Sequence, residues 1–501
     1  MANPLRRLLG ETALYGLSSV LGRVLNFLLV PLYTQVLPAD GYGIVTDLYA
    51  WVAFLLVVYT FGMETSFFRH ATKNPEHAER YYRASTTAIF ITSLTLSLLL
   101  VGLATPIVGY LQYPGKEVFV YWLVGILFID AFSAIPFAQL RLQHKAKPFA
   151  IIKLFGIALN IGLNLFFILL CPAVHAGEAV PFLSPLVEWV YKPTWDVEYI
   201  FLSNLVANGV MLLLLVPTLR TFRPEFQWKF LRPMLVYAYP LLFMGIAGVT
   251  NEMMSRAFLK QLMPEGFYAG RTNQESLGIF GACYKLAVFM NLAVQAFRYA
   301  AEPFFFGRAK DKNSPQLFAQ VMHGFILLGA LMLVGITVNL EWLGPLMLRR
   351  PEYLEALHIV PTLLLANLLL GVYFNLSVWF KLTDRTYFGT GIALGGALLT
   401  VVFNLMLIPT WGYEGAALTT VLVYAVMTIA NFWLGQKHYP IPYHTNKGLL
   451  YLFLSTVIAF GFRYYLLPTG TIVSLVVGNL LLLSLLLVML RFERRLFKTL
   501  T

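Results

Sequence analysis

Long apolar stretches follow one another along almost the whole chain, separated by short polar connections. Each stretch approaches or exceeds the roughly 20 mostly apolar residues that an α-helix needs to cross a bilayer. We therefore predict fourteen transmembrane helices, near residues 9–37, 43–67, 85–111, 118–140, 149–171, 199–219, 233–259, 277–304, 317–340, 356–380, 388–409, 415–435, 449–467 and 472–490.

The basic residues are distributed unevenly between these connections. The chain carries 36 Lys and Arg against 24 Asp and Glu, a net charge of +12. Most of the Lys and Arg lie in every second connection and near both ends of the chain, from Arg6 and Arg7 to Arg494, Arg495 and Lys498. Basic connections mark the cytoplasmic side of a membrane protein, so we predict that both termini are cytoplasmic. Membrane topology then explains the positive net charge. Because the charge needs no polyanion to explain it, we expect no nucleic-acid partner.

Two parts of the chain resemble each other at an offset of about 225–240 residues. Arg141-Leu142-x-x-Lys145 recurs as Lys381-Leu382-x-x-Arg385, and Gln35-Val36-Leu37-Pro38 recurs as Gln261-Leu262-Met263-Pro264. The repeat pairs spans 1–6 with spans 7–12. An even number of spans per repeat gives both parts the same orientation, which is the parallel-repeat plan of several transporters. Two such bundles can enclose a central cleft and rock about it.

This repeat predicts an all-α polytopic membrane protein with two six-helix lobes around a central cleft. The expected boundaries are an N-lobe at 1–219, a cytoplasmic linker at 220–232, a C-lobe at 233–437, and a C-terminal helix pair with a basic cytoplasmic tail at 438–501. The connection at 172–198 holds Trp189 and Trp195, and we expect it to lie partly at the outer interface, where Trp is favoured. The first apolar stretch lacks a small-residue cleavage site, so we expect it to be a span rather than a signal peptide.

The chain resembles a known family over nearly its whole length. It is similar to the multidrug/oligosaccharidyl-lipid/polysaccharide (MOP) flippase superfamily, and within it to the O-antigen (Wzx-type) oligosaccharide flippases. The resemblance is carried by Gly22-Arg23-Val24-Leu25-Asn26, Pro31-Leu32-Tyr33-Thr34-Gln35-Val36-Leu37, Gly41-Tyr42-Gly43, Tyr237-Ala238-Tyr239-Pro240-Leu241, Gly278-Ile279-Phe280-Gly281-Ala282 and Trp411-Gly412-Tyr413-Glu414-Gly415-Ala416-Ala417.

The resemblance implies a transporter rather than an enzyme. Its expected substrate is a polyprenyl-pyrophosphate-linked oligosaccharide, moved by alternating access from the cytoplasmic to the outer leaflet of the bacterial inner membrane. This would support polysaccharide, lipopolysaccharide or O-antigen biosynthesis. The expected partners are membrane lipids and the polysaccharide polymerase machinery. Two alternatives stay open, a lipid II flippase and a multidrug or cation antiporter of the same superfamily.

Six cations fall inside the predicted spans. An ionisable side chain at that depth is costly unless it faces protein or water, and Arg and Lys are the residues that bind phosphate oxygens. Because the family places spans 1, 2, 7 and 8 around the cleft, the resemblance favours Arg23, Arg256, Lys285 and Arg298 as substrate-binding residues. The spacings Glu252/Arg256 and Arg298/Glu302 also permit pairing along one helix. The other two cations, Lys153 and Arg463, lie near span ends and can reach the headgroups.

Two acids, Asp47 and Asp130, lie deep in spans 2 and 4. Either can bind Na⁺ or a proton and couple transport to an ion gradient, or pair with Arg23 or another cation. No cofactor or metal is expected, because no Walker motif, HExxH or CxxC pattern occurs. Gly391-x-x-x-Gly395 is interpreted as a site of close helix packing.

Overall fold

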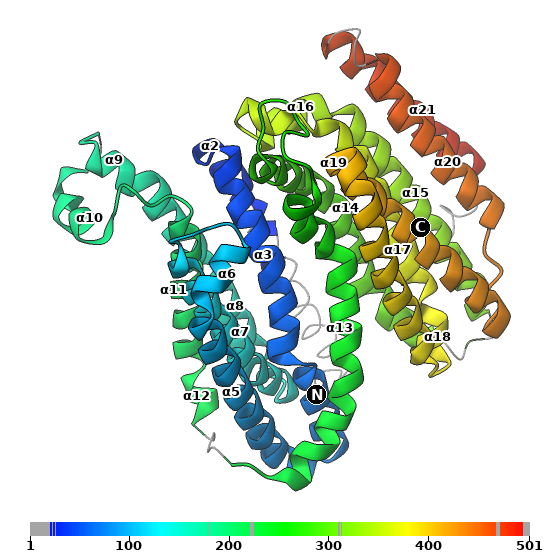
Figure 1. The fold of residues 1–501 in the computed structure, drawn as a ribbon. Helices are drawn as coiled ribbons and strands as arrows, with labels where there is room; N and C mark the ends of the chain where they lie inside the picture. The colour runs from blue at the N-terminus through cyan, green and yellow to red at the C-terminus, as the bar shows by residue number, and fades with distance from the viewer. Residues whose placement is uncertain are drawn as a thin grey trace. The chain divides into compact units, whose positions relative to one another are not determined.

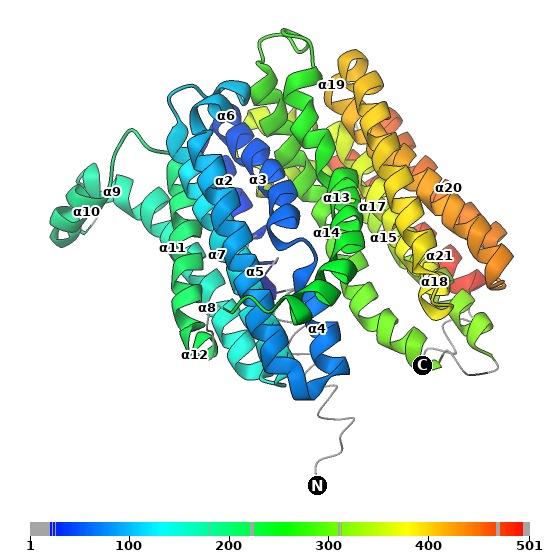
Figure 2. The same ribbon diagram turned by 60° about the horizontal axis from the view of Figure 1, so that its bottom comes forward.

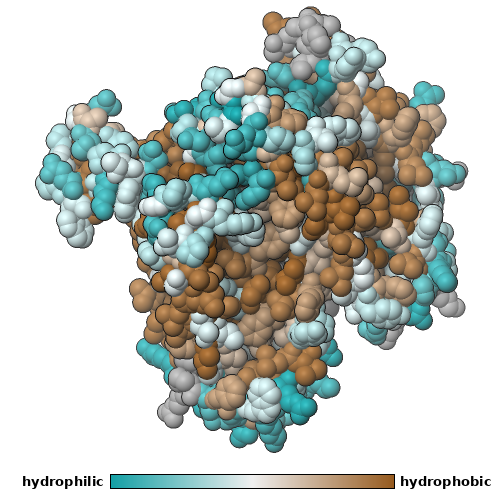
Figure 3. Space-filling view, in the orientation of Figure 1, coloured by the Kyte–Doolittle hydropathy of each residue, from teal (hydrophilic) through white to brown (hydrophobic). Residues whose placement is uncertain are grey.

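The structure, a computed structural model, describes residues 21–22, 24–25, 27–178, 180–220, 225–308, 311, 313–466 and 471–493. Over these residues the chain is helical and forms no β-strand, as predicted. Eleven helical segments in this part of the chain are long and apolar enough to cross a membrane. Apolar side chains cover much of the helix flanks on the face seen in Figure 3, and hydrophilic ones gather near the helix ends. The expectation of a multi-pass helical membrane protein is confirmed.

The predicted number of fourteen spans needs one helix to be divided. Helix α19 (Thr386–His438) has 53 residues, which at 1.5 Å per residue would reach about 80 Å, against a hydrocarbon core of about 30 Å. Gly412 interrupts it with φ 55° and ψ −133°, so α19 consists of two helices that meet at a kink. Helix α11 (Glu198–Leu214) is apolar but only 17 residues long, and much of the first predicted span lies outside the described residues. Fourteen spans and cytoplasmic termini therefore stay predictions.

One compact unit contains the described part of Met1–Leu29 together with Leu48–Val249. Its helices α5, α7, α8 and α11 pack against their neighbours in the bundle (Figures 1 and 2). Buried Tyr59, Phe67 and Tyr82 form its core with Met234. The elements complete in this unit are α4 (Met63–Lys73), α5 (Ala78–Gly102), α6 (Ala104–Tyr110), α7 (Glu117–Leu142), α8 (Ala146–Leu165), α9 (Cys171–His175), α10 (Ser184–Val190), α11 and α12 (Val216–Leu219).

The connection between α8 and α11 protrudes from this unit. Helices α9 and α10 extend away from the α5–α8 bundle (Figure 1). Phe182 is 81 % exposed and Trp189 84 % exposed, whereas Trp195 contacts the ring of Trp122 with a centroid distance of 5.2 Å. Exposed aromatic rings of this kind are favoured at a membrane interface, and the interfacial position of this connection stays a prediction.

The other compact unit contains Val30–Asp47 and the described part of Thr250–Thr501. Helices α14, α15, α17 and α19 form its centre, and α20 and α21 pack against α15 (Figures 1 and 2). Its elements are α2 (Val30–Val36), α14 (Asn273–Arg308), α15 (Ser314–Val338), α16 (Leu340–Met347), α17 (Val360–Leu376), α18 (Val378–Leu382), α19, α20 (Thr445–Gly461) and α21 (Thr471–Phe492). Helices α3 (Ala39–Thr60) and α13 (Trp228–Leu262) each contribute to both units.

One buried carboxylate, which follows α21, adds polar contacts to the packing of α20 and α21 against α15. Glu493, 6 % exposed, accepts hydrogen bonds from Lys447 Nζ at 3.0 Å and from the Tyr451 hydroxyl at 3.2 Å. His323 Nε2 of α15 lies 3.2 Å from its other oxygen. The predicted pair outside the repeat is therefore joined to the rest of its unit by a buried polar cluster.

One packing prediction is wrong. A Cβ atom at Gly391 or Gly395 would meet nothing within 4 Å, whereas one at the adjacent Gly396 would lie 2.4 Å from the Met427 sulfur. Glycines four residues apart define one helix face, but this face is open, and the close contact occurs at the next residue.

Candidate functional site

Two of the predicted cations meet in the C-terminal unit. Arg256 of α13 places its guanidinium 3.9 Å from the centroid of the Tyr284 ring, and its Nη1 lies 2.9 Å from the Met253 sulfur. Lys285, which follows Tyr284 on α14, lies within electrostatic range of Arg256. Arg23, the other deep cation predicted from the sequence, lies outside the described residues.

Close helix packing sets the position of Lys285. A Cβ atom at Gly278 would lie 1.9 Å from the Ala39 carbonyl oxygen, and one at Gly281 would lie 2.3 Å from Thr46 Oγ1. Only glycine permits this approach between α14 and the first turns of α3. Lys285 is four residues beyond Gly281 and so lies on the same face of α14, one turn further along. Lys285 therefore lies one helical turn beyond the two glycines that contact α3.

The carboxylate partner that the sequence offered to Arg256 is not used. Among the described side chains, neither Arg256 nor Lys285 forms an ion pair, and Glu252 is exposed. Stacking on Tyr284 replaces the possible Glu252 contact, because a guanidinium is attracted to the face of an aromatic ring. Two cations at this depth are thus left with hydrogen-bonding capacity for an anion.

The two deep acids, in contrast, have protein partners. Asp47 Oδ2 lies 3.7 Å from Lys260 Nζ, and both side chains are almost fully buried. Asp130 accepts a hydrogen bond of 2.9 Å from Asn208 and lies within electrostatic range of Lys153. Asp47 therefore pairs with a cation, as one of its two predicted alternatives required, and that cation is Lys260 near the end of α13. A role of Asp47 and Asp130 in cation coupling stays a prediction.

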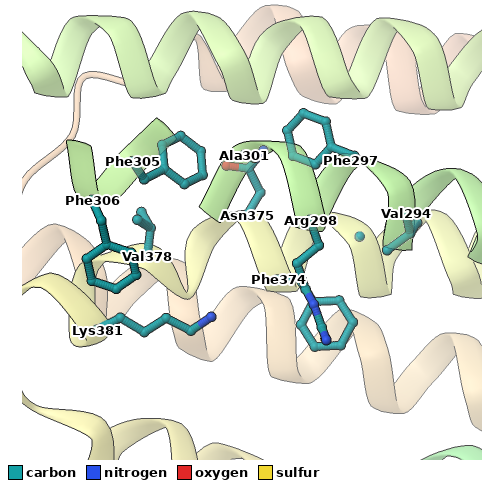
Figure 4. Close-up of a pocket in the computed structure, with 11 residues that line it drawn as sticks. Val294, Phe297, Arg298, Ala301, Phe305, Phe306, Phe374, Asn375, Val378 and Lys381 are labelled. Carbon is teal, nitrogen blue, oxygen red and sulfur yellow. The ribbon is translucent and has the colours of Figure 1, made fainter. Parts of the chain in front are cut away.

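Arg298, near the other end of α14, lines a separate pocket. Its guanidinium lies 4.9 Å from the centroid of the Phe374 ring of α17. The pocket has an empty volume of about 380 Å³, including its open mouth, and Lys381 of α18 extends along it toward Arg298 (Figure 4). The predicted Arg298–Glu302 pair cannot be assessed, because the Glu302 side chain lies outside the described residues.

The cations assigned to span ends have contacts inside the protein. Lys153 Nζ lies 4.2 Å from the centroid of the Phe137 ring, and Arg463 Nη1 lies 3.6 Å from Glu341. Both side chains therefore have a partner within the protein, whereas Lys285 forms no ion pair with any side chain that the structure describes.

Sequence reasoning missed Lys260, Lys381 and Asn375 as neighbours of predicted residues. Lys260 and Lys381 each follow a long apolar run, where a cation is expected to lie in a connection. Asn375 lies within the predicted span at residues 356–380, and no motif around it marks it as a site residue. Only the structure shows that Asn375 lines the same pocket as Arg298, whose guanidinium stacks on the ring of Phe374.

Residues 8–176 match the family described as "Polysaccharide biosynthesis protein". A stretch of 103 residues is 33 % identical to the "Uncharacterized membrane protein MJ1068" of Methanocaldococcus jannaschii, and the match spans 20 % of this chain and 20 % of that protein.

Solved structures reveal the same fold at low sequence identity. "Lipid II flippase MurJ, inward closed conformation" is 12 % identical, with a TM-score of 0.69 over 95 % of this chain and 99 % of that one. The inward-facing form of a multidrug resistance MATE family transporter of the MOP superfamily is 13 % identical, with a TM-score of 0.60 over 85 % and 94 %. A MOP superfamily transporter from Pyrococcus furiosus, whose title reads "Reverse polarity of binding pocket suggests different function", is 14 % identical, with a TM-score of 0.54 over 85 % and 95 %.

The described helices thus define a multi-pass membrane protein with the fold of the MurJ and MATE structures. The predicted resemblance to the MOP superfamily is confirmed by this fold together with the polysaccharide-biosynthesis match over residues 8–176. The narrower resemblance to O-antigen flippases stays a prediction.

Proposed function

We propose that this protein is a transporter that moves a polyprenyl-pyrophosphate-linked oligosaccharide from the cytoplasmic to the outer leaflet of a bacterial inner membrane by alternating access. The observation that carries this proposal is the contrast between deep cations and deep acids. Arg256 and Lys285 lack a carboxylate partner among the described residues, whereas Asp47 has Lys260 and Asp130 has Asn208.

This contrast favours an anionic substrate. A cation antiporter needs carboxylates that are available to its substrate, and here the deep acids already have donors. A pyrophosphate group needs donors to replace its hydration in hydrocarbon, and guanidinium and ammonium groups supply them through charge-assisted hydrogen bonds. The match to polysaccharide biosynthesis supports an oligosaccharide on that lipid.

A lipid II flippase remains the second candidate. Its favouring observation is the similarity in fold to the MurJ structure over almost the whole chain. Cations that recognise a pyrophosphate do not separate the two functions, since both substrates contain this group. The two functions differ in the surface glycan whose synthesis requires the protein.

Deletion of the gene in its native host tests the proposal. We expect lipid-linked oligosaccharide repeat units to accumulate on the cytoplasmic face and surface polysaccharide to be lost, because the pyrophosphate cannot cross hydrocarbon unaided. Accumulation of the peptidoglycan precursor instead would support the lipid II alternative. Unchanged export of both would contradict the proposal.

We also propose that Asp47 or Asp130 couples transport to a Na⁺ or H⁺ gradient and that the transporter delivers its substrate to the polysaccharide polymerase machinery. Because Asp47 contacts Lys260 and Asp130 accepts a hydrogen bond from Asn208, binding of Na⁺ or a proton to either acid would have to break that contact, which would link ion binding to a change in helix packing. Transport that responds to neither a sodium nor a pH gradient would contradict the coupling proposal.

A further inference from the structure

A large apolar cavity lies within the C-terminal unit. It is lined by residues of α15, α17, the second half of α19 and α20, where α15 packs against α17 and α20, and α17 packs against α19 (Figures 1 and 2). Its volume is about 440 Å³, within the range of about 300–1,000 Å³ that is usual for ligand-binding pockets. The described residues that line it include no Asp, Glu, Lys or Arg. The cavity therefore suits a ligand that is largely apolar.

The cavity lies at one end of these helices. Helix α19 ends at His438 and α20 begins at Thr445, and Tyr443 and His444 of the short connection between them line the cavity. From there the lining extends along α20 to Leu452, seven residues beyond Thr445, or about 10 Å. This depth falls within the hydrocarbon of one leaflet, which is about 15 Å thick. On the predicted topology this connection is cytoplasmic, which assigns the cavity to the inner leaflet.

Exposed apolar side chains form one side of the cavity. Ile429 and Trp433 of α19 and Leu449 of α20 line it and are 52 %, 72 % and 60 % exposed. The opposite side includes Met322 of α15 and Leu376 of α17, which are both buried. Because these helices are candidate membrane spans, exposed apolar side chains on them face hydrocarbon. A chain from the bilayer can thus enter between α19 and α20 without crossing water.

The size of the cavity matches one acyl chain. A methylene group takes up about as much space as a water molecule in the liquid, about 30 Å³, so the cavity holds on the order of 15 chain carbons. An acyl chain that spans one leaflet has about this length, whereas the polyprenyl chain of a saccharide carrier is several times longer and carries a methyl branch on every isoprene unit. A peptide segment is disfavoured, because its backbone polar groups would find too few partners in this lining.

Most polar groups of the lining gather at the end where α20 begins. Thr428 lies deeper, and its hydroxyl donates a hydrogen bond to a carbonyl of α17. Tyr443, His444 and Thr445 follow one another at the start of α20, and the ring of His323 lies against that of His444 with a centroid distance of 5.5 Å. The first turn of α20 contains no acidic residue, so the positive end of its helix dipole favours a phosphate there. An apolar cavity with this polar end matches an amphiphile whose chain points into the bilayer.

We propose that this cavity binds one acyl chain of an inner-leaflet phospholipid, whose phosphate lies at the start of α20, and that the lipid joins α20 to α17 and α19. The inference needs only the membrane location of the protein and does not rest on the proposed substrate. The chain fills space that side chains of the four helices leave open. The bound lipid then adds to the contacts of Glu493 in holding the C-terminal helix pair against the rest of its unit.

The test measures binding of palmitoyl-oleoyl phosphatidylglycerol to the purified full-length protein in detergent by native mass spectrometry. Two variants fill the cavity from different helices, Ala425→Phe on α19 and Leu452→Trp on α20. Their matched controls, Val426→Phe and Leu450→Trp, add the same rings at exposed neighbouring positions that do not line the cavity. Thermal unfolding with and without the lipid provides a second measurement.

We expect each filled variant to bind phosphatidylglycerol about tenfold more weakly than its control, because the loss of two buried methylene groups already has an effect of this size. The lipid should raise the midpoint of thermal unfolding of the wild type and the controls, since a ligand that binds the folded state stabilises it. It should not change the midpoint of the filled variants. A cooperative transition of these variants without lipid separates loss of the site from loss of the fold.

Equal binding of phosphatidylglycerol by a folded filled variant and its control would overturn the proposal. Displacement of phosphatidylglycerol by an equal concentration of undecaprenyl phosphate would also overturn it, because the cavity would then belong to the chain of a saccharide carrier. The wild type tests the proposal without any variant. Phosphatidylglycerol binding to the wild type that does not saturate, or that leaves its midpoint of unfolding unchanged, would contradict a single built site for one chain.

Discussion

At the scale of single residues, Lys285 illustrates how a cation can be kept in an unfavourable place. It lies on a helix face whose earlier positions, Gly278 and Gly281, are in close contact with α3. The helix cannot rotate to move the ammonium group elsewhere without breaking that contact. A charge held in this way is expected to serve a ligand, because an unpaired charge in the hydrocarbon region is destabilising.

We predict that Lys285→Ala lowers transport by tenfold or more, about the effect of losing a charge-assisted hydrogen bond, and leaves the amount of inserted protein unchanged. Arg23→Ala is expected to behave in the same way. Surface-polysaccharide export and quantification of membrane protein provide the measurement, with Lys437→Ala, at an exposed cation, as the control. Normal export by both variants would contradict the role of the deep cations.

The Asp47–Lys260 pair gives a prediction of stability. Asp47→Asn leaves Lys260 buried without its carboxylate, and we expect a loss of about 3–5 kcal/mol in the free energy of unfolding. Adding Lys260→Met should recover most of this, because the unpaired charge is removed. Denaturant unfolding in detergent measures both effects. A double variant that regains stability but loses dependence on a Na⁺ or H⁺ gradient would support the coupling role, whereas unchanged dependence would assign the pair to structure.

At the scale of helices, α14 combines a packing function with a binding function. Its early glycines permit the contact with α3, its middle carries Lys285, and its last turns carry Arg298. The same helix therefore links the two cationic positions without a loop between them. A change at the glycine contact should affect the whole unit.

We predict that Gly278→Ala destabilises the protein by about 1–3 kcal/mol, because the new methyl group would overlap the Ala39 carbonyl and overpacking carries this penalty. Gly391→Ala is the matched control, since its Cβ would enter open space. It should be neutral or stabilising by up to about 1 kcal/mol through helix propensity. Thermal unfolding in detergent compares the two variants. Equal midpoints would contradict the prediction, because they would show that α14 and α3 can move apart at little cost.

The attachment of α20 and α21 should depend on pH through Glu493. Burial raises the pKa of this carboxyl, but the hydrogen bond from Lys447 and the nearby charges of His323 and Lys447 outweigh it, so the net pKa is lowered. The stabilisation is then present above the ordinary pKa of a glutamate and is lost as pH falls through the lowered value. We predict that wild-type stability decreases at acidic pH by more than that of Glu493→Gln. Parallel pH profiles of unfolding for the two proteins would contradict this.

At the scale of the whole molecule, the sequence predicted the helical class, because it follows from a local property, whereas the role of the deep cations stays a prediction. Apolar length identifies a span, and the position of Lys285 within its span indicates its depth. Partners were harder to predict. Lys260 reaches Asp47 across more than two hundred residues, and periodicity alone does not show which helices face each other. The Gly391/Gly395 spacing failed for the same reason, since it defines a face but not a neighbour.

The grouping of the helices into compact units also could not be predicted from the repeat. The repeat divides the chain between spans 6 and 7, whereas the packing of the backbone groups Val30–Asp47 with the C-terminal unit and the start of α13 with the N-terminal unit. Thr34 donates a hydrogen bond of 3.0 Å to the Met347 carbonyl, and the Tyr353 hydroxyl donates one of 2.9 Å to the Leu37 carbonyl. Such contacts depend on backbone positions that no residue pattern specifies.

The central claim is tested most directly by reconstituting the purified protein into liposomes and measuring the movement of a polyprenyl-pyrophosphate-linked oligosaccharide between leaflets. The account predicts protein-dependent movement that is lost in Lys285→Ala and retained in Lys437→Ala. Protein-dependent movement that is the same in wild type and Lys285→Ala, or no movement of this lipid by active, folded protein, would contradict it.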